Sequence, residues 1–317
     1  MAGEFEIIER YFAPLAGPAG LGLKDDAALM KAPDDMSLVM TKDISVAGVH
    51  FPHTLSADAT GWRVLAVNLS DLAAKGARPL GYLLGLGLTG REDENWLAAF
   101  AAGLGKAQLF GRCQLLGGDT VRTGERLTVS ISAIGAVPDG QFVPRNKASA
   151  GDVVYVTGTL GDASLGLACM QGTLMSDDYL IERFSYPRPR VSMVPVLREF
   201  ASAAVDISDG LMADAGHIAD TSQVAVKLEQ ARLPLSDSAR SVLSHHPDEW
   251  PKIWSGGDDY EILCTIRPAS VQAFEKKAAE AGVPVTAIGT VTAGKGVFLH
   301  DLDGQPVARG NLGFQHF

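Results

Sequence analysis

The chain has 317 residues, 46% of them hydrophobic and 20% charged, so it is long enough for two domains and has the composition of an ordinary globular protein. Its 37 acidic residues exceed its 27 basic ones, and the net charge of −10 argues against a nucleic acid or an anionic membrane as a partner held by bulk charge. No apolar run approaches the roughly 18 residues of a membrane span. The first twelve residues carry acids inside their apolar pattern, unlike a secretory signal.

The cysteines Cys113, Cys169 and Cys264 are widely spaced, with no CxxC and no metal-ligand spacing. This usage is typical of buried free thiols in a reducing compartment, so we expect a cytoplasmic protein.

The first half of the chain alternates between helical and strand patterns. A helix with an apolar face at three- and four-residue steps is predicted to begin at a Thr60 cap and to end near Gly76. The segment Gly117-Gly118-Asp119-Thr120 reads as a turn after a short strand. The other predicted elements are helices at 4–15 and 92–110 and strands at 37–43, 81–88, 113–116 and 127–137.

A polar, glycine-containing stretch near residues 140–150 predicts a domain boundary, and we divide the chain into an N-terminal domain, 1–148, and a C-terminal domain, 149–317. Strands and helices alternate on both sides of the boundary, so the fold class is α/β or α+β. The second half is predicted to contain strands at 152–157, 203–206, 224–228, 261–266 and 283–291 and helices at 164–171, 178–184, 190–201 and 268–281.

Carboxylates recur at strand ends, in glycine turns and on one helix face. On the central helix Asn68, Asp71 and Lys75 share a face away from the apolar side, which alone is typical of a solvated surface. A single aspartate in such a position is usually a cap or turn residue, whereas several converging ones would bind hard cations such as Mg²⁺. Spacing alone leaves both readings open for the set Asp26, Asp43, Asp71, Asp119, Asp206 and Asp209.

Two common nucleotide-binding patterns are absent or misleading. Gly85-Leu-Gly87-Leu-Thr-Gly90 matches GxGxxG, but its first two glycines lie inside a strand pattern and no acid follows about 20 residues later. No GxxxxGK[ST] sequence occurs. Any nucleotide site therefore uses another architecture.

A series of short motifs runs along the whole chain. They are Gly3-Glu-Phe, Lys24-Asp-Asp26-Ala-Ala, Val46-Ala-Gly-Val-His50-Phe, Ala66-Val-Asn-Leu-Ser-Asp71, Gly117-Gly-Asp-Thr120, Val154-Tyr-Val-Thr-Gly158, Asp206-Ile-Ser-Asp-Gly210, Gly256-Gly-Asp-Asp-Tyr-Glu261 and Gly313-Phe-Gln-His-Phe317. In sequence and in order, these motifs resemble those of the thiamine-monophosphate kinases. Related ATP-using enzymes with a similar fold are aminoimidazole ribonucleotide synthetase, selenophosphate synthetase and a hydrogenase-maturation protein.

The resemblance implies a synthetase-like fold of two α/β domains and a homodimer in which the N-terminal domains pair. It implies a role in thiamine biosynthesis: direct in-line transfer of the γ-phosphoryl group of ATP to thiamine monophosphate, giving thiamine diphosphate and ADP without a phosphoenzyme. Asp71 would be central to a set of Mg²⁺ ions. The implied metal ligands are Asp26, Thr41, Asp43, Asp71, Asp119, Asp206 and Asp209. The implied ATP contacts are Gly118, Asp119, Arg145 and Ser208, and the implied substrate contacts are His50, Asp258 and Phe314.

The residue types suit that reaction. The acceptor is a phosphate that is already ionised at neutral pH, so charge neutralisation and positioning matter more than a protein base. Divalent ions on an aspartate cluster supply the neutralisation, with Arg145 as a fixed fork for phosphate and Phe314 as a ring for a cationic heteroaromatic.

Three positions depart from the family pattern. Lys24 stands where glycine is usual before the aspartate pair, Lys42 stands between Thr41 and Asp43 where Thr is usual, and Asp258 replaces a common Glu. The lysines bear on the charge of the metal site, and Asp258 keeps its charge on a side chain that is one methylene shorter.

Two other functions compete with the kinase. One is a related ATP-dependent synthetase, against which we find no reactive cysteine near the N-terminus. The other is a non-catalytic ATP- or thiamine-phosphate-binding relative, for which Lys24 and Lys42 would be signs of decay. Magnesium-dependent turnover separates the leading hypothesis from the second.

Overall fold

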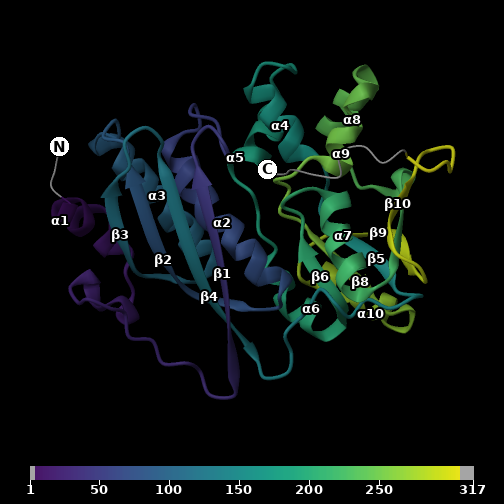
Figure 1. Cartoon of the computed structure of the whole chain (residues 1–317), viewed down its shortest axis with the longest axis horizontal. Helices are drawn as coiled ribbons and strands as arrows, with labels where there is room; N and C mark the ends of the chain where they lie inside the picture. The colour runs from purple at the N-terminus through teal and green to yellow at the C-terminus, as the bar shows by residue number, and fades with distance from the viewer. Residues whose placement is uncertain (1–3, 308–317) are drawn as a thin grey trace. The chain divides into compact units, whose positions relative to one another are not determined.

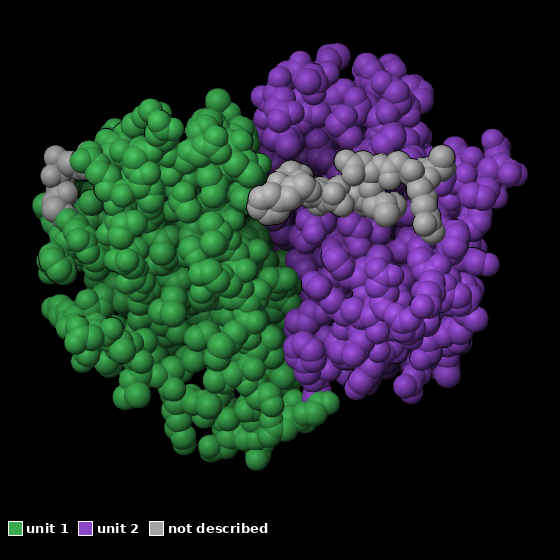
Figure 2. Space-filling model, viewed as in Figure 1, with its two compact units in different colours: residues 1–72, 77–140 green, residues 73–76, 141–317 purple. Residues whose placement is uncertain are grey.

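The computed structural model describes residues 4–307 and divides into two compact units, coloured separately in Figure 2. Unit 1 comprises residues 1–72 and 77–140, and unit 2 comprises residues 73–76 and 141–317. Each unit contains its own sheet, as expected for a two-domain α/β protein.

Unit 1 is built on a four-stranded sheet in the order β1-β4-β2-β3, with two long helices on one face (Figure 1). The β2–β3 pair is parallel, and β4 runs antiparallel to both β1 and β2. Its elements are α1 (Glu4–Ile7), which continues as irregular helical turns to Leu15, β1 (Met36–Val46), α2 (Ala57–Ala74, whose last two residues belong to unit 2), β2 (Arg78–Leu88), α3 (Glu94–Gly111), β3 (Gln114–Arg122) and β4 (Thr128–Pro138).

The core of unit 1 follows from the periodicity of these elements. Alternate residues of β2, among them Tyr82, Leu84 and Leu86, are buried, as are Leu65 and Leu69 of α2. The helices therefore cover one face of the sheet and leave the other face without a layer of its own.

Two local predictions in unit 1 were wrong. The central helix begins at Ala57, where the Ser56 hydroxyl accepts the Ala59 N–H at 3.2 Å, while the Thr60 hydroxyl, inside the helix, donates to the Ser56 carbonyl. The segment 117–120 lies within β3 and forms no turn. A Cβ at Gly118 would lie 2.0 Å from the Leu84 carbonyl oxygen, so this glycine allows two strands to approach each other.

Unit 2 is built on a six-stranded sheet in the order β10-β7-β9-β5-β8-β6 (Figure 1). The strands are β5 (Val153–Thr157), β6 (Ala201–Asp206), β7 (Ala225–Glu229), β8 (Ile262–Ile266), β9 (Val285–Thr292) and β10 (Gly296–His300). The helices are α4 (Asp162–Met170), α5 (Asp178–Ser185), α6 (Val194–Phe200), α7 (Leu211–Ser222), α8 (Asp237–His245), α9 (Pro251–Ser255) and α10 (Val271–Glu280).

Both faces of this sheet are covered. In β5, Val154 and Val156 belong to the core beneath α4, α7 and α8, whereas Tyr155 belongs to the core beneath α6 and α10. The two-residue period of a strand thus divides the apolar side chains between two layers. The strand β10 and the short helices α8 and α9 were not predicted from the sequence.

Candidate functional site

The first group of candidate residues lies between β1 and α2 in unit 1. The Thr41 hydroxyl donates to Asp71 Oδ2 at 2.5 Å. Burial, and then the neighbouring charge of Asp71, raises the pKa of Asp43 to about 6. Thr41 and Asp43 are two residues apart on one strand, so they face the same side, toward the helix that carries Asp71.

This group fits a hard divalent cation. Two neighbouring carboxylates and a hydroxyl are oxygen ligands. The raised pKa of Asp43 reflects burial first and then the charge of Asp71, and a bound cation would offset both. One turn before Asp71, the buried Asn68 amide nitrogen donates to the Val64 carbonyl at 3.1 Å, while the Asn68 amide oxygen has no hydrogen-bond partner among the described residues. Such an orphaned acceptor suits a ligand or a metal-bound water.

Two other predicted residues of unit 1, Asp119 and Asp26, are exposed. Asp119 is exposed on β3, and its register with Gly85 places it on the opposite face of the sheet from Thr41 and Asp43. The strands β1 and β3 form the two edges, roughly 14 Å apart at three strand spacings. Asp26 is exposed in a bend, where its N–H donates to Asp25 Oδ1 at 2.8 Å.

Lys42 points away from the Thr41–Asp71 group. Its ammonium donates to the Ser130 hydroxyl at 3.0 Å on the face that carries Asp119. The lysine therefore forms no ion pair with the carboxylate of Asp43 or Asp71.

His50 lies in the turn that follows β1. Its Nδ1 accepts the Val46 N–H at 3.0 Å, so the neutral ring carries its proton on Nε2. The turn is closed by a 2.8 Å hydrogen bond from the Gly48 N–H to the Phe51 carbonyl, with Gly48 at a φ of +79°. A local hydrogen bond thus fixes the tautomer and orientation of this imidazole.

The second group lies in unit 2, in the turn between β6 and α7. Asp206 ends β6 and is buried, whereas Ser208 and Asp209 are partly exposed in the turn. Gly210 has a φ of +118°, and a Cβ there would lie 2.8 Å from the Ser255 carbonyl carbon, so only glycine fits.

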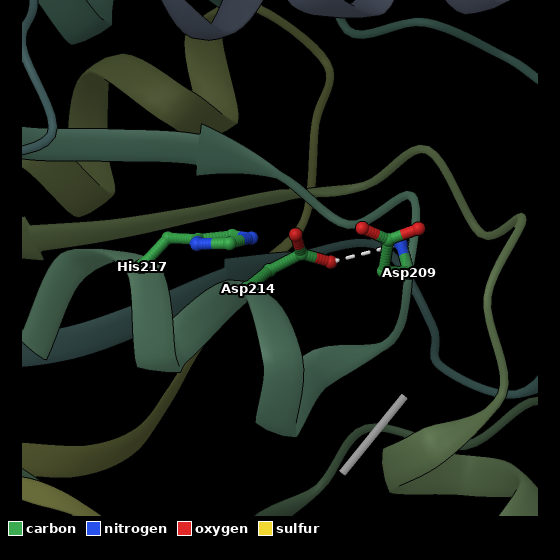
Figure 3. Close-up of side chains that lie close together, drawn as sticks. All are labelled: Asp209, Asp214 and His217. Carbon is green, nitrogen blue, oxygen red and sulfur yellow. Dashed lines mark hydrogen bonds between the residues drawn. The ribbon is translucent and has the colours of Figure 1, made fainter. Parts of the chain in front are cut away.

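Sequence reasoning missed Asp214 and His217 in α7, which Figure 3 shows beside Asp209. One potential ligand atom from each of the three residues lies within 4.8 Å of the others. Asp214 is 1% exposed and His217 is exposed. An acid in the first turn of a helix, as in a capping box, was the available signal for Asp214.

The environment of Asp214 pulls its pKa in two directions. Burial and the charge of Asp209 raise it, whereas hydrogen bonds from the backbone N–H groups of the turn lower it, and the pKa is about 7. Burial dominates.

The third group is the segment Gly256–Glu261, which runs beside the same turn. The Asp258 N–H donates to the Ser208 carbonyl at 2.9 Å, and the Tyr260 hydroxyl donates to Asp258 Oδ1 at 3.1 Å. Asp258 and Tyr260 have φ values of +74° and +50°, a strained left-handed conformation for residues with a Cβ.

Buried anchors hold that strained segment. Asp259 accepts the Gly161 and Ala163 N–H groups at 2.7 and 3.2 Å, and burial raises its pKa well above the ordinary value. Glu261 is fully buried and accepts hydrogen bonds from Arg183 and Arg190. Buried and partly exposed residues alternate along this segment, so Asp258 and Tyr260 are partly exposed.

Two further predicted residues lie elsewhere. The Arg145 carbonyl accepts the Thr221 and Ser222 hydroxyls at the C-terminal end of α7, whereas Ser208 precedes the N-terminal end of this 12-residue helix, about 18 Å away. The Arg145 backbone and Ser208 therefore lie at opposite ends of α7. Phe314 lies outside the described residues.

Comparison with known proteins places these groups in a family. The AIR synthase related protein N-terminal domain matches residues 24–137, and the AIR synthase related protein C-terminal domain matches residues 149–301. The thiamine-monophosphate kinase of Caulobacter vibrioides is 41% identical over 319 residues, covering 99% of this chain and 90% of that protein. The chain belongs to the thiamine-monophosphate kinase family.

Further thiamine-monophosphate kinases show the same likeness. The Escherichia coli K12 protein is 39% identical, with coverage of 99% of this chain and 98% of that one. The crystal structure of the Stenotrophomonas maltophilia K279a kinase has a TM-score of 0.83 at 40% identity and covers 90% of this chain and 91% of that chain. A structure described as AaThiL complexed with AMPPCP and TMP has a TM-score of 0.79 at 31% identity, covering 99% and 97%.

More distant relatives share the fold alone. The hydrogenase maturation protein HypE has a TM-score of 0.80 at 19% identity.

Within residues 4–307 we find no helix that combines the length and the apolarity needed to cross a bilayer. Two expectations from the sequence, a two-domain α/β fold and membership of this kinase family, are confirmed.

Proposed function

We propose that the protein is an ATP-dependent kinase that transfers the γ-phosphoryl group to thiamine monophosphate and forms thiamine diphosphate and ADP. The observation that carries the proposal is full-length identity of 39–41% with named kinases, supported by AaThiL complexed with AMPPCP and TMP. The carboxylate groups around Asp71 and Asp209 suit that chemistry.

The task of such a site is to bring two anions together. The attacking oxygen of thiamine monophosphate is already ionised, so the barrier lies in charge repulsion and alignment. Bound Mg²⁺ would neutralise the phosphates and bridge their oxygens. The Thr41–Asp71 hydrogen bond holds one carboxylate still, and the anchors Asp259 and Glu261 hold Asp258.

The residue roles form part of the proposal. Asp71, Asp43 and Thr41 would hold metal in unit 1, and Asp206 and Asp209 would do so in unit 2. His50 would donate from Nε2 to the substrate, and Asp258 would pair with its cationic or amino-bearing ring. Asp26 and Asp119 as further metal ligands, Gly118, Asp119, Arg145 and Ser208 as ATP contacts, and Phe314 as a substrate contact rest on the resemblance alone.

A homodimer through unit 1 also belongs to the proposal. The sheet face not covered by α2 and α3 exposes Met40 (69%), Ile44 (49%) and Leu83 (42%). The register places all three on one side, because Met40 pairs with Ile134, Ile44 with Ser130 and Leu83 with Ser132. Exposed apolar side chains on a sheet face that no helix covers mark an interaction surface, and we assign it to a second copy.

Thiol chemistry argues against the synthetase alternative. Burial raises the pKa of Cys113 and of Cys264 to about 12, so neither is a ready nucleophile at neutral pH. The free thiols suit a cytoplasmic location.

The boundary between the two functional domains, in this proposal, lies between residues 148 and 149.

The test is product formation from ATP and thiamine monophosphate, with Mg²⁺ present or chelated, in the wild type and Asp71→Asn. We expect thiamine diphosphate and ADP in equal amounts only with Mg²⁺, and a loss on the order of 10²-fold in the variant. Binding of both ligands without diphosphate formation would instead favour a non-catalytic relative.

A further inference from the structure

A single carboxylate oxygen organises the turn that carries Ser208 and Asp209. Asp214 Oδ2 accepts the N–H groups of Ser208, Asp209 and Gly210, each at 3.1 Å. Asp214 is 1% exposed, and its own N–H donates to the Gly210 carbonyl at 3.0 Å. Figure 3 shows its carboxylate between the His217 ring and the turn.

Without Asp214 this turn would attract anions. Consecutive N–H groups after a strand, at the start of a helix, form a concave site with positive partial charge that suits phosphate. In this protein an internal carboxylate satisfies all three donors. The groups left to face solvent are oxygen acceptors, the Asp209 carboxylate and the Ser208 hydroxyl, both partly exposed.

We propose that Asp214 is a positioning residue that turns this helix start from an anion site into a cation site. It removes three donors from the turn and fixes the backbone from which Asp209 projects. Phosphate groups then reach the turn through a bound divalent cation. The inference rests on the assignment of Asp209 to magnesium under the proposed function.

A plain helix cap is the competing explanation, and the chain offers a matched control. Asp177 precedes α5 in the same unit and accepts the Leu180 N–H at 3.0 Å. Asp177→Ala removes a helix cap in an element that carries none of the proposed ligands. If Asp214 were only a cap, Asp214→Ala and Asp177→Ala would change the melting temperature, and neither would change Mg²⁺ binding.

The experiment is calorimetric titration of the full chain with Mg²⁺ in the absence of nucleotide, for the wild type, Asp214→Ala, Asp214→Asn, Asp177→Ala and Asp209→Asn. The Mg²⁺ binding signal that is lost in Asp209→Asn is assigned to the turn. We expect Asp214→Ala to weaken that event about tenfold. Asp214→Asn keeps an acceptor oxygen and should weaken it less, and Asp177→Ala should leave it unchanged.

A second readout needs no metal. Inorganic phosphate at constant ionic strength should raise the melting temperature of Asp214→Ala, whose three N–H groups have lost their acceptor, and should not raise that of the wild type. Unchanged Mg²⁺ binding in Asp214→Ala, or equal phosphate effects in the two proteins, would overturn the inference. A wild type that binds Mg²⁺ at the turn but forms no thiamine diphosphate would refute the proposed function and leave the inference standing.

Discussion

At the scale of single residues, neighbours rather than residue type set the chemistry of the acids. Asp43, Asp214 and Asp259 all have raised pKa values because burial disfavours their charge, although each has a different partner. The sequence marked Asp43 and Asp71 through motif and helical face. It did not mark Asp214, whose role depends on three N–H groups that converge only after the turn has folded.

The raised pKa of Asp214 predicts how stability depends on pH. A folded pKa of about 7 against an ordinary 3.8 means that the folded chain binds more protons between these values, so the free energy of unfolding falls as pH rises from 4 to 7. The difference corresponds to roughly 4 kcal/mol. With a chelator present, the free energy of unfolding of Asp214→Asn should fall less than that of the wild type between pH 4 and 7, by about this amount.

Denaturant unfolding at a series of pH values checks this expectation. Asp177→Ala, which removes a capping carboxylate from α5, is the matched control for the loss of a cap. Parallel profiles for the wild type and Asp214→Asn would show that Asp214 is already ionised in the folded protein at pH 4.

His217 predicts a preference among metals. Two carboxylates with one imidazole form a better ligand set for Zn²⁺ than oxygen ligands alone, because imidazole is a softer donor. We expect Zn²⁺ to bind this cluster in competition with Mg²⁺, and His217→Ala to weaken Zn²⁺ binding about tenfold with little effect on Mg²⁺. Titration calorimetry measures both.

The matched control is His245→Ala, which alters another exposed histidine in unit 2 at the end of α8. Equal Zn²⁺ affinity in the wild type and His217→Ala would rule out the imidazole as a ligand.

At the scale of elements, glycine positions separate turns from close strand contacts. The sequence predicted the strands of unit 1, but it could not distinguish a glycine needed for a turn from one needed for close packing. A Cβ at Gly118 meets the Leu84 carbonyl oxygen at 2.0 Å, whereas a Cβ at the adjacent Gly117 meets Leu83 Cδ2 at 3.5 Å, an ordinary contact.

This contrast predicts opposite outcomes for neighbouring substitutions. Gly118→Ala should force β2 and β3 apart and destabilise the protein by 3 kcal/mol or more, on the order of other severe backbone clashes. Gly117→Ala should change the free energy of unfolding by less than about 1 kcal/mol. Urea unfolding of both variants decides it. Similar stability of the two would mean that the β2–β3 spacing can relax.

At the scale of the whole molecule, local pattern predicted the class but not the topology. Alternating strand and helix signals gave two α/β domains, and the order β10-β7-β9-β5-β8-β6 could not be predicted from them. Pairing of distant strands depends on packing between segments that lie far apart in the chain, which no window of sequence contains. The anchors of Asp258 illustrate this, since Arg183 and Arg190 reach Glu261 across more than 70 positions.

The exposed sheet face of unit 1 leads to a prediction about assembly. Met40 and Ile44 lie on the bare face of β1, and a carboxylate at either position would lose its hydration in a dimer formed there. Met40→Asp and Ile44→Asp should therefore convert a dimer into a monomer, as measured by light scattering after size-exclusion chromatography. Leu109→Asp is the matched control, because Leu109 is 79% exposed on α3, away from this face. Asp119, which is a metal and ATP ligand under the proposed function, lies on the same bare face. Kinase activity should therefore fall together with the dimer. A wild type that is monomeric at all concentrations would refute the dimer. A dimer that survives both β1 substitutions and is lost in Leu109→Asp would place the interface elsewhere.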